Sequence, residues 1–115
     1  MSYSPIPCLS VEDLAIVLAD NHDSVQLIDV RELSEVAIAF LPNFLILPLS
    51  EFEQWSEKIM SELDKDTETI VICHHGIRSA QMCQWLTHQG FSNVKNVSGG
   101  IDAYSRYVDP TMPRY

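Results

Sequence analysis

The chain has 115 residues, of which 46% are hydrophobic and 20% charged, a composition that favours one globular domain over a disordered chain. Seven basic against 16 acidic residues give a formal net charge of −9, which argues against nucleic acid or an anionic membrane as a partner. The longest apolar run, residues 36–42, is too short to cross a bilayer, and the N-terminal segment lacks the basic and apolar regions of a secretory signal, so we expect a cytoplasmic protein.

The first half of the chain predicts three strands and two helices. An extended segment at 6–9 precedes Ser10, which can cap a helix because apolar residues recur behind it at helical spacing. Residues 25–30 have the branched apolar character of a buried strand. We expect a short helix over 31–40 and a short strand over 44–49.

The second half continues the alternation. Ser50 can cap a helix that reaches about residue 63, and 69–73 is a continuous apolar strand. A helix over 78–89, a last strand over 93–97 and a final helix over 101–107 follow. Strands that alternate with helices predict an α/β domain with a mostly parallel sheet covered on both faces.

The limits of the domain follow from the same pattern. We expect residues 1–115 to form a single domain, with an ordered core over about 6–108 and a C-terminal tail over 109–115. In parallel sheets, sites form beyond the carboxyl ends of the strands. Cys73 falls at the end of the most apolar strand, so the site is expected there.

The segment 73–79, CHHGIRS, joins that strand to the next helix. Gly76 allows the loop to curl with its backbone N–H groups pointing inward, and the unpaired N–H groups at the start of the helix add positive potential. A thiolate on Cys73 is stabilised inside such a ring. Arg78 adds a cation with a planar fork for an anionic substrate, so an acidic protein can still hold an anion locally.

This loop resembles the active-site loop of the rhodanese family of sulfurtransferases, whose single-domain members carry Cys-x-x-Gly-x-Arg. Two further segments match the family: LIDVRE (27–32), with Glu35 after it, and QGFSNVKNVSGGIDAY (89–104). The resemblance covers nearly the whole chain. It implies a three-layer α/β/α fold around a five-stranded, mostly parallel sheet, with no cofactor.

The resemblance also implies a persulfide mechanism. The Cys73 thiolate would attack the sulfane sulfur of a donor such as thiosulfate, carry it as a persulfide, and pass it to cyanide or a thiol. The implied partners are this small anionic donor, the acceptor, and a protein that relays sulfur. The implied substrate-binding positions are His74, His75, Gly76, Ile77, Arg78 and Ser79.

The sequence departs from the family pattern before the third strand. Ala39 and Phe40 replace the family's glycine and histidine, and Asn43 stands where glycine follows the proline. Asparagine can adopt the left-handed conformation, so we expect the turn to survive. The replacements alter the expected pocket wall and leave the preferred donor and acceptor open.

Other polar and sulfur-bearing residues receive structural interpretations. Asp29 and Arg31 end a strand on the side of the loop, and we expect them to support it through an ion pair. Adjacent Cys73, His74 and His75 rarely point at one ion, so we expect no metal. The three cysteines are odd in number and form no CxxC motif, which favours reduced thiols, with Cys83 on the inward face of its helix.

Two alternative functions remain open. Cysteine phosphatases and arsenate reductases use a similar loop but place five residues between cysteine and arginine, whereas four separate Cys73 from Arg78 here. The shorter ring suits one sulfur atom better than a tetrahedral phosphate. The second alternative is a regulatory or sulfur-relay module that does not turn over free donors.

Overall fold

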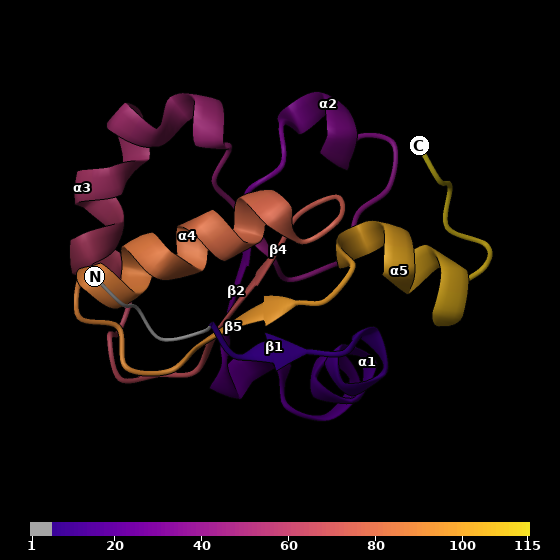
Figure 1. The fold of residues 1–115 in the computed structure, drawn as a ribbon, viewed down its shortest axis with the longest axis horizontal. Coiled ribbons are helices and arrows are strands. Elements are labelled where there is room, and N and C mark those ends of the chain that lie inside the picture. Colours follow the sequence, from indigo (N-terminus) through magenta and orange to yellow (C-terminus); the bar gives the residue numbers. More distant parts are fainter. Residues whose placement is uncertain (1–5) are drawn as a thin grey trace.

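Five parallel strands form the central sheet of the structure, a computed structural model that describes residues 6–115 (Figure 1). Their order across the sheet is β1-β5-β4-β2-β3. The predicted α/β architecture with a five-stranded, mostly parallel sheet is therefore confirmed. The strands are β1 (Cys8–Leu9), β2 (Gln26–Asp29), β3 (Leu45–Ile46), β4 (Thr69–Ile72) and β5 (Val94–Val97).

Helices cover both faces of this sheet and complete three layers. Trp55 of α3 and Met82 of α4 belong to the core on one face, and Leu14 of α1 and Ile101 of α5 belong to the core on the other. The helical segments are α1 (Val11–Asp20), η1 (His22–Ser24), α2 (Leu33–Val36), η2 (Leu49–Glu51), α3 (Phe52–Glu62), α4 (Ile77–His88) and α5 (Gly100–Tyr107).

β4 lies in the middle of the sheet, and all its residues are buried. Val71 packs in the core shared with α3 and α4, whereas Ile70 and Ile72 pack in the core shared with α1 and α5. A strand with helices on both faces has no polar side, which explains its continuous apolar sequence. β4 thereby delivers Cys73 to the carboxyl edge of the sheet.

Two elements are shorter than the sequence predicts. α2 is one turn instead of a helix over 31–40, and β3 has two residues instead of spanning 44–49. β3 is an edge strand between Pro42 and Pro48, and proline has no N–H group to extend the ladder of hydrogen bonds. The apolar residues of this region are only partly packed, because Leu41 and Leu47 are buried whereas Phe40 and Leu45 are exposed.

The predicted caps have opposite outcomes. Ser10 caps α1, because its Oγ accepts a hydrogen bond of 3.1 Å from the Asp13 N–H. The prediction for Ser50 is wrong, because α3 begins only at Phe52 and Ser50 lies in the preceding 3₁₀ turn η2. The Ser50 hydroxyl instead donates to the Glu32 carboxylate, a stronger acceptor than a neutral oxygen.

Two turns adopt the left-handed backbone that their sequence favours. Asn43 has φ of 72°, which confirms that it replaces glycine in the turn before β3. Gly90 has φ of 102° just after α4, as expected of a C-terminal cap.

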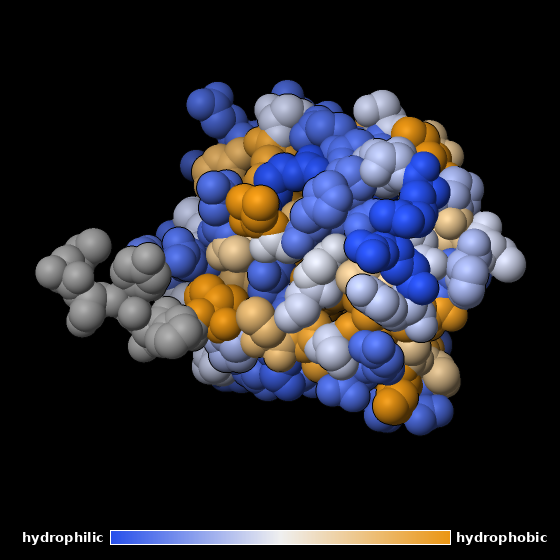
Figure 2. All heavy atoms as spheres, turned by 45° about the vertical axis from the view of Figure 1, so that its right-hand side comes forward, coloured by the Kyte–Doolittle hydropathy of each residue, from blue (hydrophilic) through white to orange (hydrophobic). Residues whose placement is uncertain are grey.

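The surface is mixed in polarity. Figure 2 shows apolar residues as separate patches among hydrophilic ones on the face that carries α5. Within residues 6–115, no helix combines the length and the apolar character needed to cross a membrane.

Candidate active site

Cys73 follows β4 directly, and its side chain is 1% exposed. Its Sγ accepts a hydrogen bond of 3.0 Å from the Gly76 N–H, and the Ser79 hydroxyl oxygen lies 3.2 Å away. Gly76 has φ of +101°, in the left-handed region that favours glycine, so the chain can turn back on the sulfur. The structure thus gathers three of the predicted site residues around one sulfur atom.

The N-terminus of α5 holds the outer side of this loop (Figure 1). The Ile101 N–H donates to the Cys73 carbonyl at 2.9 Å, and the Asp102 N–H donates to the His74 carbonyl at 3.1 Å. In a trans peptide the N–H points opposite to the preceding carbonyl. The N–H groups of His74 and His75 therefore point away from α5, toward the inner side of the loop.

Gly100 permits this close approach. It has φ of +63°, and a Cβ there would lie 2.4 Å from the Cys73 carbonyl oxygen and 2.5 Å from that of His74. Contacts this short between a side chain and backbone do not occur in relaxed structures. The glycine pair in the sequence therefore positions α5 against the loop rather than binding phosphate.

Asn96 of β5 joins the loop to the sheet through two hydrogen bonds. Its Nδ2 donates to the Gly76 carbonyl at 2.9 Å, and its Oδ1 accepts a hydrogen bond from the Ser79 hydroxyl. Asn96 is 7% exposed and Ser79 is fully buried. Both polar side chains therefore satisfy each other inside the protein, as buried polar groups must.

Arg78 does not point freely into solvent. Its Nη1 and Nη2 donate to the two carboxylate oxygens of Glu35 at 2.7 and 2.8 Å, which joins α4 to α2. These hydrogen bonds lower the pKa of Glu35 to about 2, although burial opposes the shift. The same bonds raise the pKa of Arg78, with burial again opposing, so the pair is charged near neutral pH.

Asp29 and Arg31 form a buried ion pair. Arg31 Nη2 donates to Asp29 Oδ2 at 2.8 Å, and the two residues are 0% and 2% exposed. Burial by itself would lower the pKa of Arg31, but hydrogen bonds to Asp29 and Tyr115 outweigh it and raise that pKa. A second Nη2 bond reaches the Ala39 carbonyl at 2.8 Å and ties down the segment that departs from the family pattern.

Tyr115 brings the C-terminal segment back to the site. Its hydroxyl accepts from Arg31 Nη1 at 2.9 Å and donates to Glu35 Oε2 at 3.0 Å. Its ring stacks on His74, with centroids 3.8 Å apart and planes at 8°. Burial lowers the pKa of His74, and the neighbouring His75 lowers it further. Tyr115 therefore links α2, the segment after β2 and the loop.

One group of side chains has metal-ligand chemistry. Ligand atoms of His74, His75 and Asp102 lie within 4.8 Å of one another. The two imidazole rings stack, with centroids 3.8 Å apart, and Asp102 already accepts from Arg114 Nε at 3.2 Å. These contacts occupy part of the group, but His74 Nε2 is buried and has no hydrogen-bond partner among residues 6–115.

The remaining predicted positions face outward or pack in the core. Ile77 is 72% exposed and His75 is also exposed, so their side chains lie outside the sulfur ring. Cys83 is fully buried on α4, and burial raises the pKa of its thiol to about 12. Cys83 is therefore a packing residue, as its helical position predicts.

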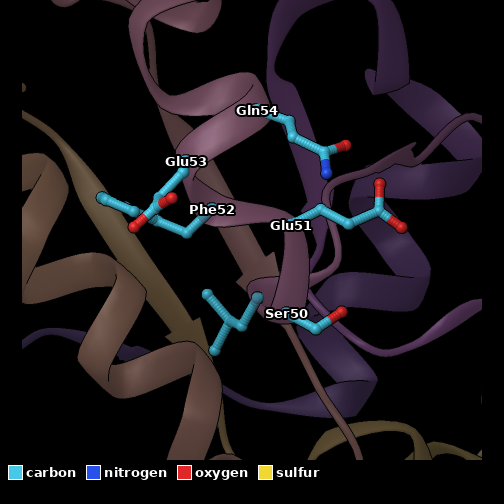
Figure 3. Close-up of a pocket in the computed structure, with 6 residues that line it drawn as sticks. Ser50, Glu51, Phe52, Glu53 and Gln54 are labelled. Carbon is cyan, nitrogen blue, oxygen red and sulfur yellow. The ribbon is translucent and has the colours of Figure 1, made fainter.

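A separate surface pocket of about 330 Å³ lies where η2 meets α3 (Figure 3). Its lining consists of consecutive residues, 49–54, and includes none of the loop 73–79. Figure 3 shows the side chains of Glu51, Glu53 and Gln54 at its edge. The pocket is thus lined by a different part of the chain from the loop that holds Cys73.

The family model described as Rhodanese-like domain matches residues 13–107. The chain belongs to this family. This confirms the resemblance found in the loop and in its flanking segments.

Two relatives and one solved structure place this rhodanese-like domain more closely. A protein of Arabidopsis thaliana named Rhodanese-like/PpiC domain-containing protein 12, chloroplastic, is 45% identical over 113 residues, which cover 96% of this chain but only 38% of that protein. A protein of Allochromatium vinosum named Sulfurtransferase is 38% identical, with 88% of this chain and 90% of that protein covered. A rhodanese-related protein of Thermoplasma volcanium has a TM-score of 0.69 at 29% identity and covers 93% and 95% of the two chains.

Sequence reasoning missed two residues of this rhodanese-like site. Asn96 carried a usable signal, because a polar residue stands at an inward-facing position of β5. Tyr115 carried none, since its contacts with Arg31 and Glu35 span more than 75 positions of sequence. Only the folded chain brings it to the loop.

Proposed function

We propose that this rhodanese-like domain is a sulfurtransferase that carries sulfur as a persulfide on Cys73. The observation that supports this most is the position of Sγ at a strand end, bonded to the Gly76 N–H, with the N–H groups of His74 and His75 turned toward the same side. In this proposal the ring encloses the one added sulfur. Thiosulfate is the simplest donor of the proposed class.

The proposed reaction has two steps. The Cys73 thiolate attacks the outer sulfur of thiosulfate, the S–S bond of the donor breaks, and its electron pair leaves with sulfite. Cyanide or a thiolate then attacks the outer sulfur of the persulfide and regenerates the Cys73 thiolate. The loop N–H groups stabilise negative charge on the outer sulfur in both steps.

Arg78 is the proposed anchor for the anionic end of the donor. Its guanidinium can make paired hydrogen bonds to sulfite oxygens as it does to the Glu35 carboxylate. The donor must therefore compete with Glu35 for Arg78. Asp29 and Arg31 are proposed as supporting residues that hold the neighbouring strand end.

A sulfur-relay module is the second candidate function. It is favoured by the occupation of both Arg78 Nη atoms by Glu35, because a free anionic donor then gains less from binding. A partner protein would bring its persulfide by contacts of its own. For either function we propose a cytoplasmic location, which suits the three free cysteines.

The test is intact-mass spectrometry after exposure to thiosulfate, mercaptopyruvate or a cysteine desulfurase donor. We expect the mass of one sulfur to be gained, to be absent in Cys73→Ser, and to persist in Cys8→Ser, which removes an exposed thiol. Steady thiocyanate production with cyanide supports the enzyme, and an adduct without turnover supports the relay. No adduct from any donor would refute both.

A further inference from the structure

Asn96 stands at a position of β5 where the sheet pattern calls for an apolar side chain. It lies two residues after Val94, which belongs to the core beneath α4, so both side chains emerge on the same face of β5. A buried amide in such a place is costly unless its polar atoms are bonded. Each of its two polar atoms bonds to the loop of Cys73.

The orientation of the Asn96 amide follows from its partners. Gly76 presents a carbonyl oxygen, which can only accept, so the amide nitrogen must face it at 2.9 Å. The amide oxygen then faces Ser79, and an amide oxygen can also only accept. The single hydroxyl hydrogen of Ser79 is therefore directed to Asn96.

This leaves only lone pairs of Ser79 toward the sulfur of Cys73, at 3.2 Å. A protonated thiol completes a chain in which the Cys73 S–H donates to Ser79 and the Ser79 O–H donates to Asn96. A Cys73 thiolate interrupts this chain of hydrogen bonds. Ser79 must then turn its hydrogen to the sulfur, which leaves Ser79 Oγ and Asn96 Oδ1 facing each other without a hydrogen between them. Ionisation of Cys73 therefore breaks the bond between Ser79 and Asn96.

We propose that Asn96 is a positioning residue that acts through Ser79 to favour the protonated form of Cys73 when no sulfur donor is bound. The persulfide does not carry the same cost, because its inner sulfur has no proton to lose and its charge lies on the outer sulfur, among the loop N–H groups. Asn96 thus favours the thiol and the persulfide over the bare thiolate. It opposes the stabilisation of the thiolate by the loop, and it protects the resting domain from unspecific alkylation.

The second contact of Asn96, the hydrogen bond from its Nδ2 to the Gly76 carbonyl, acts on the same loop. By holding the Gly76 carbonyl outward, it turns the following Ile77 N–H to the inner side of the loop. The Asn96 side chain therefore affects both the proton on the Cys73 sulfur and the N–H groups that face the outer sulfur of the persulfide. The inference deepens the proposed function but rests on it only for the persulfide.

The first test measures alkylation by iodoacetamide as a function of pH, which needs no sulfur donor. Asn96→Val frees the Ser79 hydrogen, and we expect about tenfold faster alkylation of Cys73 near about pH 6.5, with rates that converge where the thiol is fully ionised. The charged and titratable groups around the site are unchanged in this comparison: Glu35, His74, His75, Arg78, Cys83, Asp102 and Tyr115. Should Asn96→Val fail to fold, Asn96→Ala takes its place.

A double-mutant cycle decides whether the effect passes through Ser79. In Ser79→Ala, the further change Asn96→Val should leave the alkylation profile unaltered within about twofold. Asn96→Asp keeps an acceptor toward Ser79 and should not accelerate alkylation at all. An equal acceleration in both backgrounds, an acceleration in Asn96→Asp, or none in Asn96→Val would overturn the proposal. Failure to form a persulfide would instead refute the proposed function and leave this profile as it is.

Discussion

Arg78 and Glu35 meet across two elements that are 43 positions apart in sequence. Their two hydrogen bonds of 2.7 and 2.8 Å join the start of α4 to α2, and Tyr115 adds a third bond to the same carboxylate. These bonds fix the position of the Arg78 guanidinium, and both of its Nη atoms already donate to Glu35. Arg78, one of the six positions predicted to bind the donor, thus joins α4 to α2 in this structure.

The low pKa of Glu35 predicts a specific acid response. It lies at about 2, below the usual 4.5, chiefly because Arg78 bonds the ionised form. Stability from this shift is present above pH 4.5 and is lost as the pH falls through about 2. Glu35→Gln should cost about 1–2 kcal/mol at neutral pH and should flatten the decline in that window.

Urea unfolding across this pH range measures the effect. Glu53→Gln is the matched control, because Glu53 is an exposed glutamate on α3, and it should leave the curve unchanged. A Glu35→Gln protein with the acid response of the wild type would contradict the assignment.

At the scale of elements, three supports converge on the Cys73 loop. β4 delivers the cysteine, β5 holds the Gly76 carbonyl through Asn96, and the first N–H groups of α5 hold the carbonyls of Cys73 and His74. Asn96 and the N-terminus of α5 both donate hydrogen bonds to carbonyl oxygens of the loop. The inner N–H groups are thus aimed by elements that never touch the sulfur themselves.

Gly100→Ala tests the contribution of α5. The new Cβ would meet the Cys73 carbonyl oxygen at 2.4 Å, so we expect a loss of about 2–4 kcal/mol in unfolding free energy and a clear drop in Cys73 reactivity. Gly90→Ala is the control, because Gly90 also has a positive φ but a Cβ there would lie 3.5 Å from Lys65 Cδ, at the flexible end of a side chain. It should cost about 1–2 kcal/mol and leave Cys73 reactivity intact. Equal effects of both changes would show that φ alone, and not the approach of α5, matters.

At the scale of the whole molecule, the net charge of −9 opposes the approach of any anion. We expect the short-range field of the loop and of Arg78 to favour that approach. Figure 2 shows hydrophilic residues between apolar patches on one face, and charged side chains at such a surface are accessible to salt. Salt should therefore screen the distant carboxylates more than the contacts within the site.

A pair of alkylating agents separates these fields. Raising salt from about 20 to about 300 mM should increase the rate of anionic iodoacetate relative to neutral iodoacetamide by about twofold to threefold. The neutral reagent is the internal control, since its rate should change little. A relative rate that falls with salt would mean that Arg78 dominates the field even at long range.

The sequence by itself determined the alternation of strands and helices, the place of Cys73 at a strand end and the family. These features follow from local periodicity and from contiguous motifs, such as the apolar β4 and the segment 73–79. The same local signals misjudged Ser50 and overestimated β3, because a distant carboxylate and flanking prolines changed the outcome there.

Only the tertiary structure decided which groups reach the sulfur. The partners that occupy Arg78 and the hydroxyl of Ser79 are Glu35 and Asn96, which come from α2 and β5. Hydrogen bonds act over about 3 Å in space and are indifferent to separation along the chain. The carbonyls that α5 holds and the return of Tyr115 follow from the same fact, which no local pattern in the sequence reports.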